Sequence, residues 1–266
     1  MGGQRSEIRD VTVESVLAIH DHLVAEFEST SDPISPPGLR SRALLESAVA
    51  RQFTGFQGVY KYETPLACTA SLMFGICNNH PFHNGNKRIA LVTGLLHMDS
   101  NGFVLHRTNR DQLYDLMIRI ASHAMVGEAL KGRTRRGDVD AEIRELEDWL
   151  DRRARRIVRG ERPITYGRLY EILKRFGFRL GDKNKNKVEV QRRVSILGIP
   201  AWKSVYKVHC PGDGLTISTN EIKQIRRVLR LDEDHGIDSY DFYGEQTIID
   251  EYISHYRPVL RRLARA

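Results

Sequence analysis

The sequence has 266 residues, and 41% of them are hydrophobic, which is typical of a globular protein rather than a disordered one. No apolar run approaches the roughly 18 to 20 residues that a membrane span requires, and the first ten residues lack the apolar core of a signal peptide. We therefore expect a soluble cytoplasmic protein with two domains and no membrane partner.

The net charge of +7 is unevenly distributed along the chain. Residues 1–130 hold 11 Lys/Arg and 13 Asp/Glu, so residues 131–266 hold 30 and 21 and carry an excess of +9. This asymmetry favours RNA, another polyanion or an acidic protein as a partner of the second half, although basic faces can also be merely solvated. The cysteines Cys68, Cys77 and Cys210 have no metal-ligand spacing. The first two lie in a helical apolar pattern, which indicates buried free thiols in a reducing cytoplasm.

The first half of the chain predicts helices. Apolar residues recur there at helical spacing, and loops rich in Pro, Gly and Ser separate the segments. The expected helices cover residues 11–27, 41–52, 65–79, 87–101 and 109–126. Between the second and third of these, the glycines and aromatics of FTGFQGVYKYE favour a short hairpin flap. Residues 1–130 are therefore expected to form an all-α domain that carries this flap.

The second half of the chain predicts a linker, a bridging helix and a domain that contains strands. KGRTRRGD, residues 131–138, has no apolar anchor and is the expected linker, and a charged bridging helix follows over residues 139–158. Residues 159–266 predict a smaller, basic α+β accessory domain. Its expected elements are a helix at 166–176, two strands within RLGDKNKNKVEVQRRVSIL, a hairpin in VYKVHCPGDGLTIS, and helices at 220–231 and 247–266.

The stretch HPFHNGNKR, residues 80–88, interrupts two helical patterns and concentrates polar chemistry. The first N–H groups of a helix have no intrahelical acceptor and lie at the positive end of its dipole, so Gly85, Asn86 and the residues after them can form an anion cradle. Lys87 and Arg88 add two positive charges, and an Arg can offer a planar fork to phosphate oxygens. His80 has the pKa range of a general base at neutral pH.

A structural interpretation competes with each part of this stretch. His80 could be an ordinary helix-end residue, the NGNK letters could be a turn with helix caps, and Phe82 is expected to be a core anchor for the loop. The conjunction of a base, a Gly-Asn turn, paired cations and a following helix favours chemistry. Together these residues suit a hydroxyl that attacks a nucleotide phosphate in the presence of Mg²⁺.

At these residues the chain resembles the Fic/Doc superfamily, and specifically its Doc (death-on-curing) toxin branch. Fic AMP-transferases carry a Gly where this chain has Lys87 and an Arg where it has Leu91, and both differences point to Doc. The flanking segments GLRSRALLESAVA and ALVTGLLHMDSNGF are also similar to Doc segments, so the resemblance covers roughly residues 10–130.

The resemblance implies the toxin of a toxin–antitoxin pair, a kinase that transfers the γ-phosphate of ATP to a threonine of translation elongation factor Tu. It implies that His80 is the base, that Gly85, Asn86, Lys87 and Arg88 bind phosphates, and that Lys87 blocks the usual α-phosphate seat. The family often has Asp or Glu at the position of Asn84, where the side chain helps to hold Mg²⁺. An amide oxygen brings no charge, so we expect weaker metal binding here.

Two other functions remain open at this point. One is Fic-type transfer of AMP to a protein hydroxyl, and the other is a non-catalytic protein that keeps the scaffold and binds nucleic acid or protein. The self-inhibitory Ser/Thr-x-x-x-Glu-Gly/Asn sequence of many Fic proteins is absent, which favours restraint in trans by a cognate antitoxin. The second half resembles small double-stranded-RNA-binding or HicA-like modules, but it lacks the Gly-Ser-His motif of HicA toxins.

Overall fold

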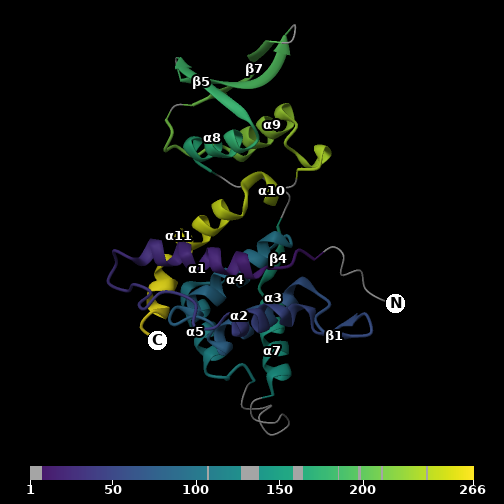
Figure 1. Ribbon diagram of the computed structural model, residues 1–266, viewed down its shortest axis with the longest axis vertical. Coiled ribbons are helices and arrows are strands. Elements are labelled where there is room, and N and C mark those ends of the chain that lie inside the picture. The colour runs from purple at the N-terminus through teal and green to yellow at the C-terminus, as the bar shows by residue number, and fades with distance from the viewer. Residues whose placement is uncertain are drawn as a thin grey trace. The chain divides into compact units, whose positions relative to one another are not determined.

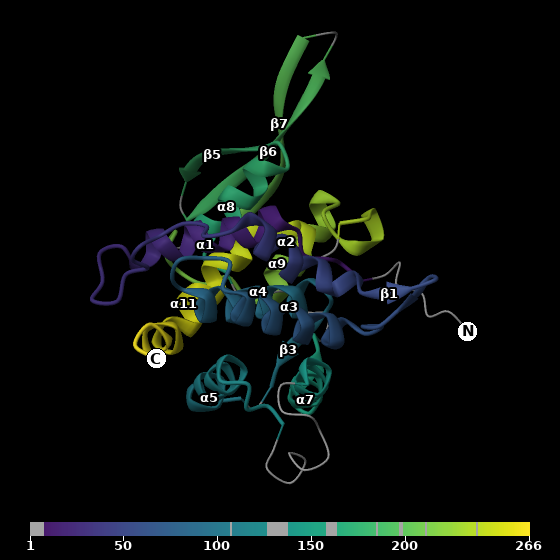
Figure 2. The ribbon, with the colours of Figure 1, turned by 60° about the horizontal axis from the view of Figure 1, so that its bottom comes forward.

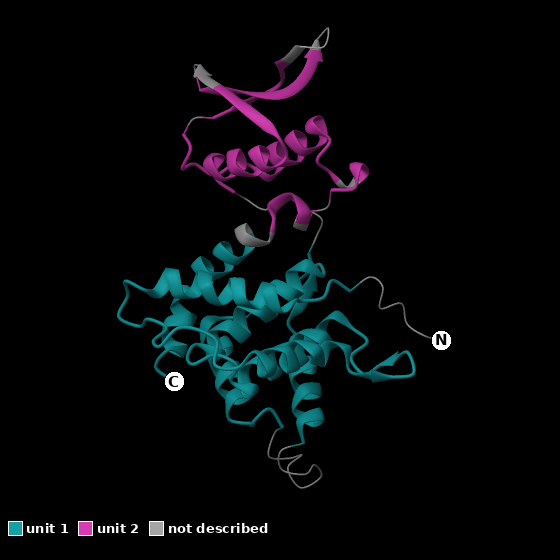
Figure 3. Ribbon diagram, viewed as in Figure 1, with its two compact units in different colours: residues 1–157, 248–266 teal, residues 158–247 magenta. Residues whose placement is uncertain are grey.

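The computed structural model describes residues 8–106, 108–126, 138–157, 164–184, 186–196, 199–210, 212–237 and 239–266. The chain forms two compact units, which Figure 3 distinguishes by colour. Unit 1 contains residues 1–157 together with 248–266, and unit 2 contains residues 158–247. Residues 131–137 of the expected linker lie outside the described residues.

Unit 1 is built around a central pair of helices, α3 and α4. Its helical segments are α1 (Val13–Phe27), α2 (Arg42–Ala50), the 3-10 helix η2 (Arg51–Phe53), α3 (Pro65–Asn79), α4 (Asn86–Ser100), α5 (Arg110–Ala121), α7 (Val139–Asp151) and most of α11 (Glu245–Leu263). In Figure 2, α3 and α4 lie side by side in the middle of the unit. All residues of α3 from Leu66 to Cys77, and all residues of α4 from Arg88 to Asp99, are buried. Because both helices are covered on every side, they form the core of the unit.

Side chains that cap the helices explain where these helices begin. The hydroxyl oxygen of Thr64 accepts a hydrogen bond from the Ala67 N–H at 3.0 Å, and Pro65 occupies the first turn of α3. Asn109 and Gln112 form a reciprocal capping box at the start of α5. Such caps satisfy backbone donors that have no intrahelical acceptor, so local sequence defines these boundaries.

Two small antiparallel sheets complete unit 1. The expected flap is present as a hairpin of β1 (Gly55–Phe56) and β2 (Val59–Tyr60). The expected helix over residues 139–158 was wrong in its last part, because α7 ends at Asp151 and the chain continues as β4 (Ala154–Arg156). This strand pairs with β3 (Phe103–Leu105), which the sequence did not predict. The guanidinium of Arg156 lies 4.3 Å from the Phe103 ring centre, so a cation–π contact supports the pairing.

The last residues of the chain pack within unit 1 rather than within unit 2. Residues 248–266, expected as part of the accessory domain 159–266, contact α1 and α4 through polar groups. The Tyr252 hydroxyl donates to Asp99 Oδ1 at 3.2 Å, and His22 Nδ1 lies 2.9 Å from Asp250 Oδ1. The central helices of unit 1 are therefore covered in part by a segment from the far end of the sequence.

Unit 2 is a three-stranded antiparallel sheet with helices. Its elements are α8 (Tyr166–Arg175), β5 (Phe178–Asn184), β6 (Lys187–Ile196), β7 (Ile199–His209), α9 (Thr219–Leu229), the 3-10 helix η3 (Glu233–His235) and α10 (Ser239–Tyr243). The strand order is β5-β6-β7, and α8 and α9 lie along one face of the sheet (Figure 1). Leu169, Val190, Val208 and Ile225 are fully buried in the core between these layers.

The small sheet-containing region was predicted, but its connections differ from the expectation. A hairpin within residues 205–218 was wrong, because residues 205–209 belong to β7 and pair with β6. In the described part of the segment that follows, Thr216 forms an isolated bridge with Thr165. The partner of β7 is thus the preceding strand along its whole length.

Two expectations from composition can be compared directly with the structure. Within the described ranges, no helix is both long and apolar enough to cross a membrane. Cys68, Cys77 and Cys210 are buried free thiols, as the sequence indicated for the first two.

Candidate functional site

The motif HPFHNGNKR forms the loop between the end of α3 and the start of α4. His80 ends α3 in the left-handed conformation, with φ of 49°, and Gly85 precedes α4 with φ of 81°. A Cβ atom on Gly85 would lie 3.0 Å from Ile34 Cδ1, so both the backbone angle and the available space favour glycine. The first helical hydrogen bond runs from the Ile89 N–H to the Gly85 carbonyl, and the N–H groups of residues 86–88 precede it. This is the geometry of an anion cradle at a helix N-terminus.

Phe82 anchors the loop, as the sequence predicted. Its side chain is 1% exposed, and its ring stacks on His20 with a centroid distance of 4.8 Å and an interplanar angle of 8°. The backbone of the loop is also held, because the N–H groups of Arg40 and Ser41 both donate to the Pro81 carbonyl, at 2.7 and 3.0 Å. The cradle is therefore a fixed part of the fold.

The side chain of Asn86 holds the loop closed from the inside. Its Oδ1 accepts from the Phe82 N–H at 3.0 Å, and its Nδ2 donates to the Phe82 carbonyl at 2.9 Å. Because both ends of the side-chain amide form these hydrogen bonds, only the backbone N–H of Asn86 remains available to bind a phosphate. Its side chain instead shapes the cradle.

His80 is exposed at the start of this loop, where α3 ends. Its pKa is lowered from the ordinary value, mainly because partial burial disfavours the charged ring and also because the positive charges of Arg40 and Lys87 lie nearby. A lowered pKa keeps the imidazole neutral at physiological pH, and a neutral ring is the form that accepts a proton. His83, in the same loop, is exposed as expected.

The two cations of the motif occupy different environments. Lys87 is partly exposed, and its ammonium donates to the Ala266 carbonyl at 2.9 Å. Arg88 is buried, with 1% exposure, and its Nη1 donates to the Asp32 carbonyl at 2.9 Å. Its guanidinium lies 5.3 Å from the Phe27 ring centre, and among the described residues its buried Nε has no hydrogen-bond partner. The structure thus places Lys87 at the surface and Arg88 in the core.

Asp32 connects this region to the last residues of the chain, a contact that the sequence did not reveal. Arg265 binds its carboxylate in a bidentate manner, with Nε to Oδ1 at 2.6 Å and Nη2 to Oδ2 at 3.0 Å, and Arg261 Nε lies 3.3 Å from Oδ2. The hydrogen bonds of Arg265 in particular hold the pKa of Asp32 well below its usual range. The backbone carbonyl of Asp32 accepts a hydrogen bond from Arg88. Asp32 therefore binds cationic side chains from two distant segments of the chain.

Asn84 is the sequence-predicted metal ligand. Its Oδ1 accepts from the Gly85 N–H at 2.6 Å, and its Nδ2 donates to the Ser35 carbonyl at 2.8 Å. Among the described residues, no group of three or more His, Cys, Asp or Glu side chains could hold a metal ion. A Mg²⁺ ion at this point would have the Asn84 amide oxygen as its protein ligand, and the phosphates of a nucleotide would have to supply further ligands.

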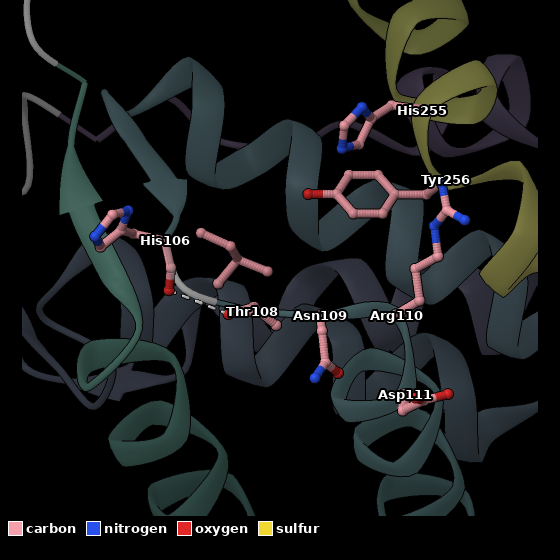
Figure 4. A pocket seen from close by; sticks show the side chains of 8 residues that line it. His106, Thr108, Asn109, Arg110, Asp111, His255 and Tyr256 are labelled. Atoms are coloured by element: carbon pink, nitrogen blue, oxygen red, sulfur yellow. Dashed lines mark hydrogen bonds between the residues drawn. The ribbon is translucent and has the colours of Figure 1, made fainter.

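A separate pocket of about 590 Å³ opens between the start of α5 and α11 (Figure 4). Its lining residues are Leu105, His106, Thr108, Asn109, Arg110, Asp111, His255 and Tyr256, and none of them belongs to the motif. The side chain of Asn109 caps α5, and Asp111 pairs with Arg262, so these polar groups already have structural partners. The pocket is therefore a surface feature apart from the candidate site.

The fold and the loop define a helical domain with an anion cradle beside an exposed histidine. Residues 10–98, about a third of the chain, match the model of the Fic/DOC family, and this segment contains the whole motif. Members of this family are transferases that act on proteins, and they use nucleotide substrates, usually with Mg²⁺. No curated protein matches the chain.

Proposed function

We propose that this chain is a Doc-like kinase that transfers the γ-phosphate of ATP to a hydroxyl group of a protein. The observation that supports this most directly is the pairing of the exposed His80, whose pKa is lowered, with a cradle whose accessible cation is Lys87. A lysine in place of a small glycine occupies space beside the cradle. We infer that it disfavours the seat of an α-phosphate and favours the γ-phosphate at the reacting position.

The proposed reaction requires little covalent chemistry from the protein. His80 accepts the proton of the acceptor hydroxyl, whose oxygen forms a bond to the γ-phosphorus while the bond to the β-phosphate oxygen breaks and ADP leaves. The backbone N–H groups after Gly85 and the ammonium of Lys87 hold the phosphates in place. Charge on the phosphates would also be neutralised by Mg²⁺, partly held by Asn84. In this proposal Arg88 contributes its positive charge to the phosphate site from within the core, and Asn86 contributes its backbone donor.

The flap offers a site for the protein acceptor. Phe56 is 78% exposed and Val59 is 64% exposed, although both are apolar and lie in a hairpin of only two strands. Unpaired strand edges and exposed apolar side chains favour the addition of an extended peptide from another protein. We propose that the segment bearing the acceptor hydroxyl adds to this hairpin.

The biological setting is proposed from the resemblance to Doc proteins. The acceptor would be a threonine of translation elongation factor Tu, and its modification would arrest protein synthesis. A cognate antitoxin would restrain the toxin in trans, because the sequence has no Ser/Thr-x-x-x-Glu-Gly/Asn helix. A cytoplasmic location follows from that target.

Labelled nucleotides test the proposal. The purified chain is incubated with cell extract and with ATP labelled in either the α- or the γ-phosphate, and the modified protein is identified. A γ-phosphate transferase leaves only the γ label on protein, whereas an α label on protein would establish AMP transfer and overturn the proposal. The absence of both labels, with toxicity retained in His80→Ala, would instead indicate a non-catalytic binding protein.

Two variants in the same loop make this experiment sharper. His80→Ala should reduce transfer by roughly 10² to 10⁴-fold, because it removes the proposed base. His83→Ala is the matched control, since it removes an exposed histidine that lies three residues away and has no assigned role. Equal losses in the two variants would show that the loop, rather than the base, had been damaged.

A further inference from the structure

The sheet of unit 2 carries an excess of positive charge. The segment 178–209, which contains β5, β6 and β7, has eight Lys/Arg and two Asp/Glu, whereas residues 232–245 have six Asp/Glu and no Lys/Arg. A basic composition can reflect no more than a solvated surface, but segregation of this kind gives one element a strong field. The sheet is therefore one basic part of unit 2 that can attract a polyanion, and residues 219–230, which hold four Lys/Arg and one Glu, are another.

The register of the strands identifies the side chains on each face of this sheet. Val188 and Val190 of β6 are buried, so their face is the one that α8 and α9 cover. On the opposite face, Gln191 pairs with Arg179 of β5, and Arg193 pairs with Trp202 of β7. Because residues 191 and 193 of one strand point to the same side, these four side chains share the outer face.

The outer face presents an aromatic ring among cations. Trp202 is 43% exposed, and the guanidinium of Arg179 lies 5.8 Å from its ring centre, so the arginine reaches across β6. Arg193 is exposed directly beside the ring. Further along the face, Lys207 holds the carboxylate of Glu189 at 2.9 Å, which neutralises an acidic group that would repel an anion.

We propose that this outer face binds single-stranded nucleic acid. Trp202 would stack on one unpaired base, and Arg179 and Arg193 would contact the backbone phosphates. Base stacking on an aromatic side chain together with a basic track is the usual way in which proteins hold single strands without sequence preference. Bases of a duplex are stacked on each other, so Trp202 would gain nothing from double-stranded DNA or RNA. An acidic peptide would satisfy the cations and leave the indole exposed.

Tryptophan fluorescence of the full chain can test this proposal, because the sequence has two tryptophans in different environments. Trp149 is 7% exposed in α7 of unit 1 and lies under Arg153 at 4.3 Å, so it should not respond to a ligand on the sheet. Titration with oligouridylate of about 12 nucleotides, a length within single-strand site sizes, should quench the signal of Trp202. Trp202→Ala should abolish the quenching and weaken binding by roughly 5- to 150-fold, whereas Trp202→Phe should retain most of the affinity.

Salt dependence and a matched charge variant complete the experiment. Arg193→Ala should reduce the slope of log K against log salt concentration by about 0.7, the effect of one lost phosphate contact on a single strand. Lys223→Ala removes one exposed cation from α9, on the covered side of the sheet, and should leave the slope unchanged. Circular dichroism checks that all four variants fold.

Several results would overturn the proposal. These are no binding even at low salt, tighter binding of a duplex than of the single strand, equal affinity of Trp202→Ala and the wild type, and equal effects of Arg193→Ala and Lys223→Ala. Each of these results would show that the ligand is not a single strand, that the Trp202 ring does not stack on a base, or that the sheet is not the binding surface.

Discussion

Replacement of Phe82 by alanine should separate the stability of the fold from the function of the motif loop. The ring is 1% exposed, stacks on His20 at 4.8 Å, and lies in a residue whose backbone N–H and carbonyl both bind the Asn86 side chain. Phe→Ala changes in a protein core cost about 3–5 kcal/mol, because the transfer free energy of the ring is lost and a cavity remains. We expect a loss in this range for Phe82→Ala.

Urea denaturation and transfer activity should be measured together. With a typical urea slope of about 2 kcal/mol/M, the expected cost lowers the unfolding midpoint by roughly 2 M. Phe74→Ala is the matched control, because Phe74 is 2% exposed on α3 and contacts His123 and Arg51 rather than the motif. Both variants should lose similar stability. At a temperature where both remain folded, only Phe82→Ala should lose most of its transfer activity, because its cradle is no longer held.

Two outcomes would refute this reasoning about Phe82. A cost below about 1 kcal/mol would mean that the surroundings collapse into the space or that the ring contributes little packing. Equal activity of the two alanine variants at equal folded fractions would mean that the loop keeps its geometry without the ring. Phe82→Leu, which preserves most of the apolar volume, should retain more of both properties than Phe82→Ala.

Three further predictions concern charge and exposure. Because Arg40 helps to lower the pKa of His80, Arg40→Ala should raise that pKa and move the acid limb of the transfer rate to higher pH; an unchanged pH profile would argue against His80 as the base. Asp32 has a lowered pKa, chiefly through Arg265, so its stabilisation is present above the ordinary carboxyl pKa and is lost as the pH falls through the folded value. Asp32→Asn should therefore lower the urea midpoint at pH 7, and the difference from the wild type should shrink progressively as the pH falls below the ordinary carboxyl pKa; a pH-independent difference would contradict this. Phe56→Ser in the flap should raise the KM for the protein acceptor without changing the urea midpoint, because the side chain is 78% exposed.

Local sequence predicted much of unit 1. The segment Pro65–Asn79 was expected as a helix and is α3, because Thr64 caps it, Pro65 suits its first turn and its apolar residues are continuous. The flap and the loop between α3 and α4 were expected for similar reasons, since glycine and aromatic positions specify them over a few residues. Such features depend on neighbours in the sequence, which is why the pattern of residues contains them.

Long-range pairing was not predictable in the same way. The short strand β4 exists because Ala154–Arg156 meets Phe103–Leu105, about 50 residues away. Likewise, the apolar stripe of α11 indicated a helix but not what it packs against. Arg261 of α11 and Arg265, just after this helix, contact Asp32, which lies more than 220 positions away. An amphipathic pattern specifies that a face is buried, while the identity of the covering surface is a property of the whole fold.

The motif itself shows how a sequence pattern can combine roles that the fold separates. Asn86 and Arg88 were both expected to bind phosphate, but in the structure the amide of Asn86 closes the loop and the guanidinium of Arg88 is buried against Phe27 and Asp32. The polarity of a side chain at a helix start does not indicate whether it points toward a ligand or into the protein. Of the side chains with a proposed role, His80, Asn84 and Lys87 lie at the surface, as a proton acceptor, a metal ligand and a cation. The chemistry proposed for this site therefore depends on these exposed side chains, on backbone donors and on the buried charge of Arg88, while Phe82 and the amide of Asn86 hold the loop in position.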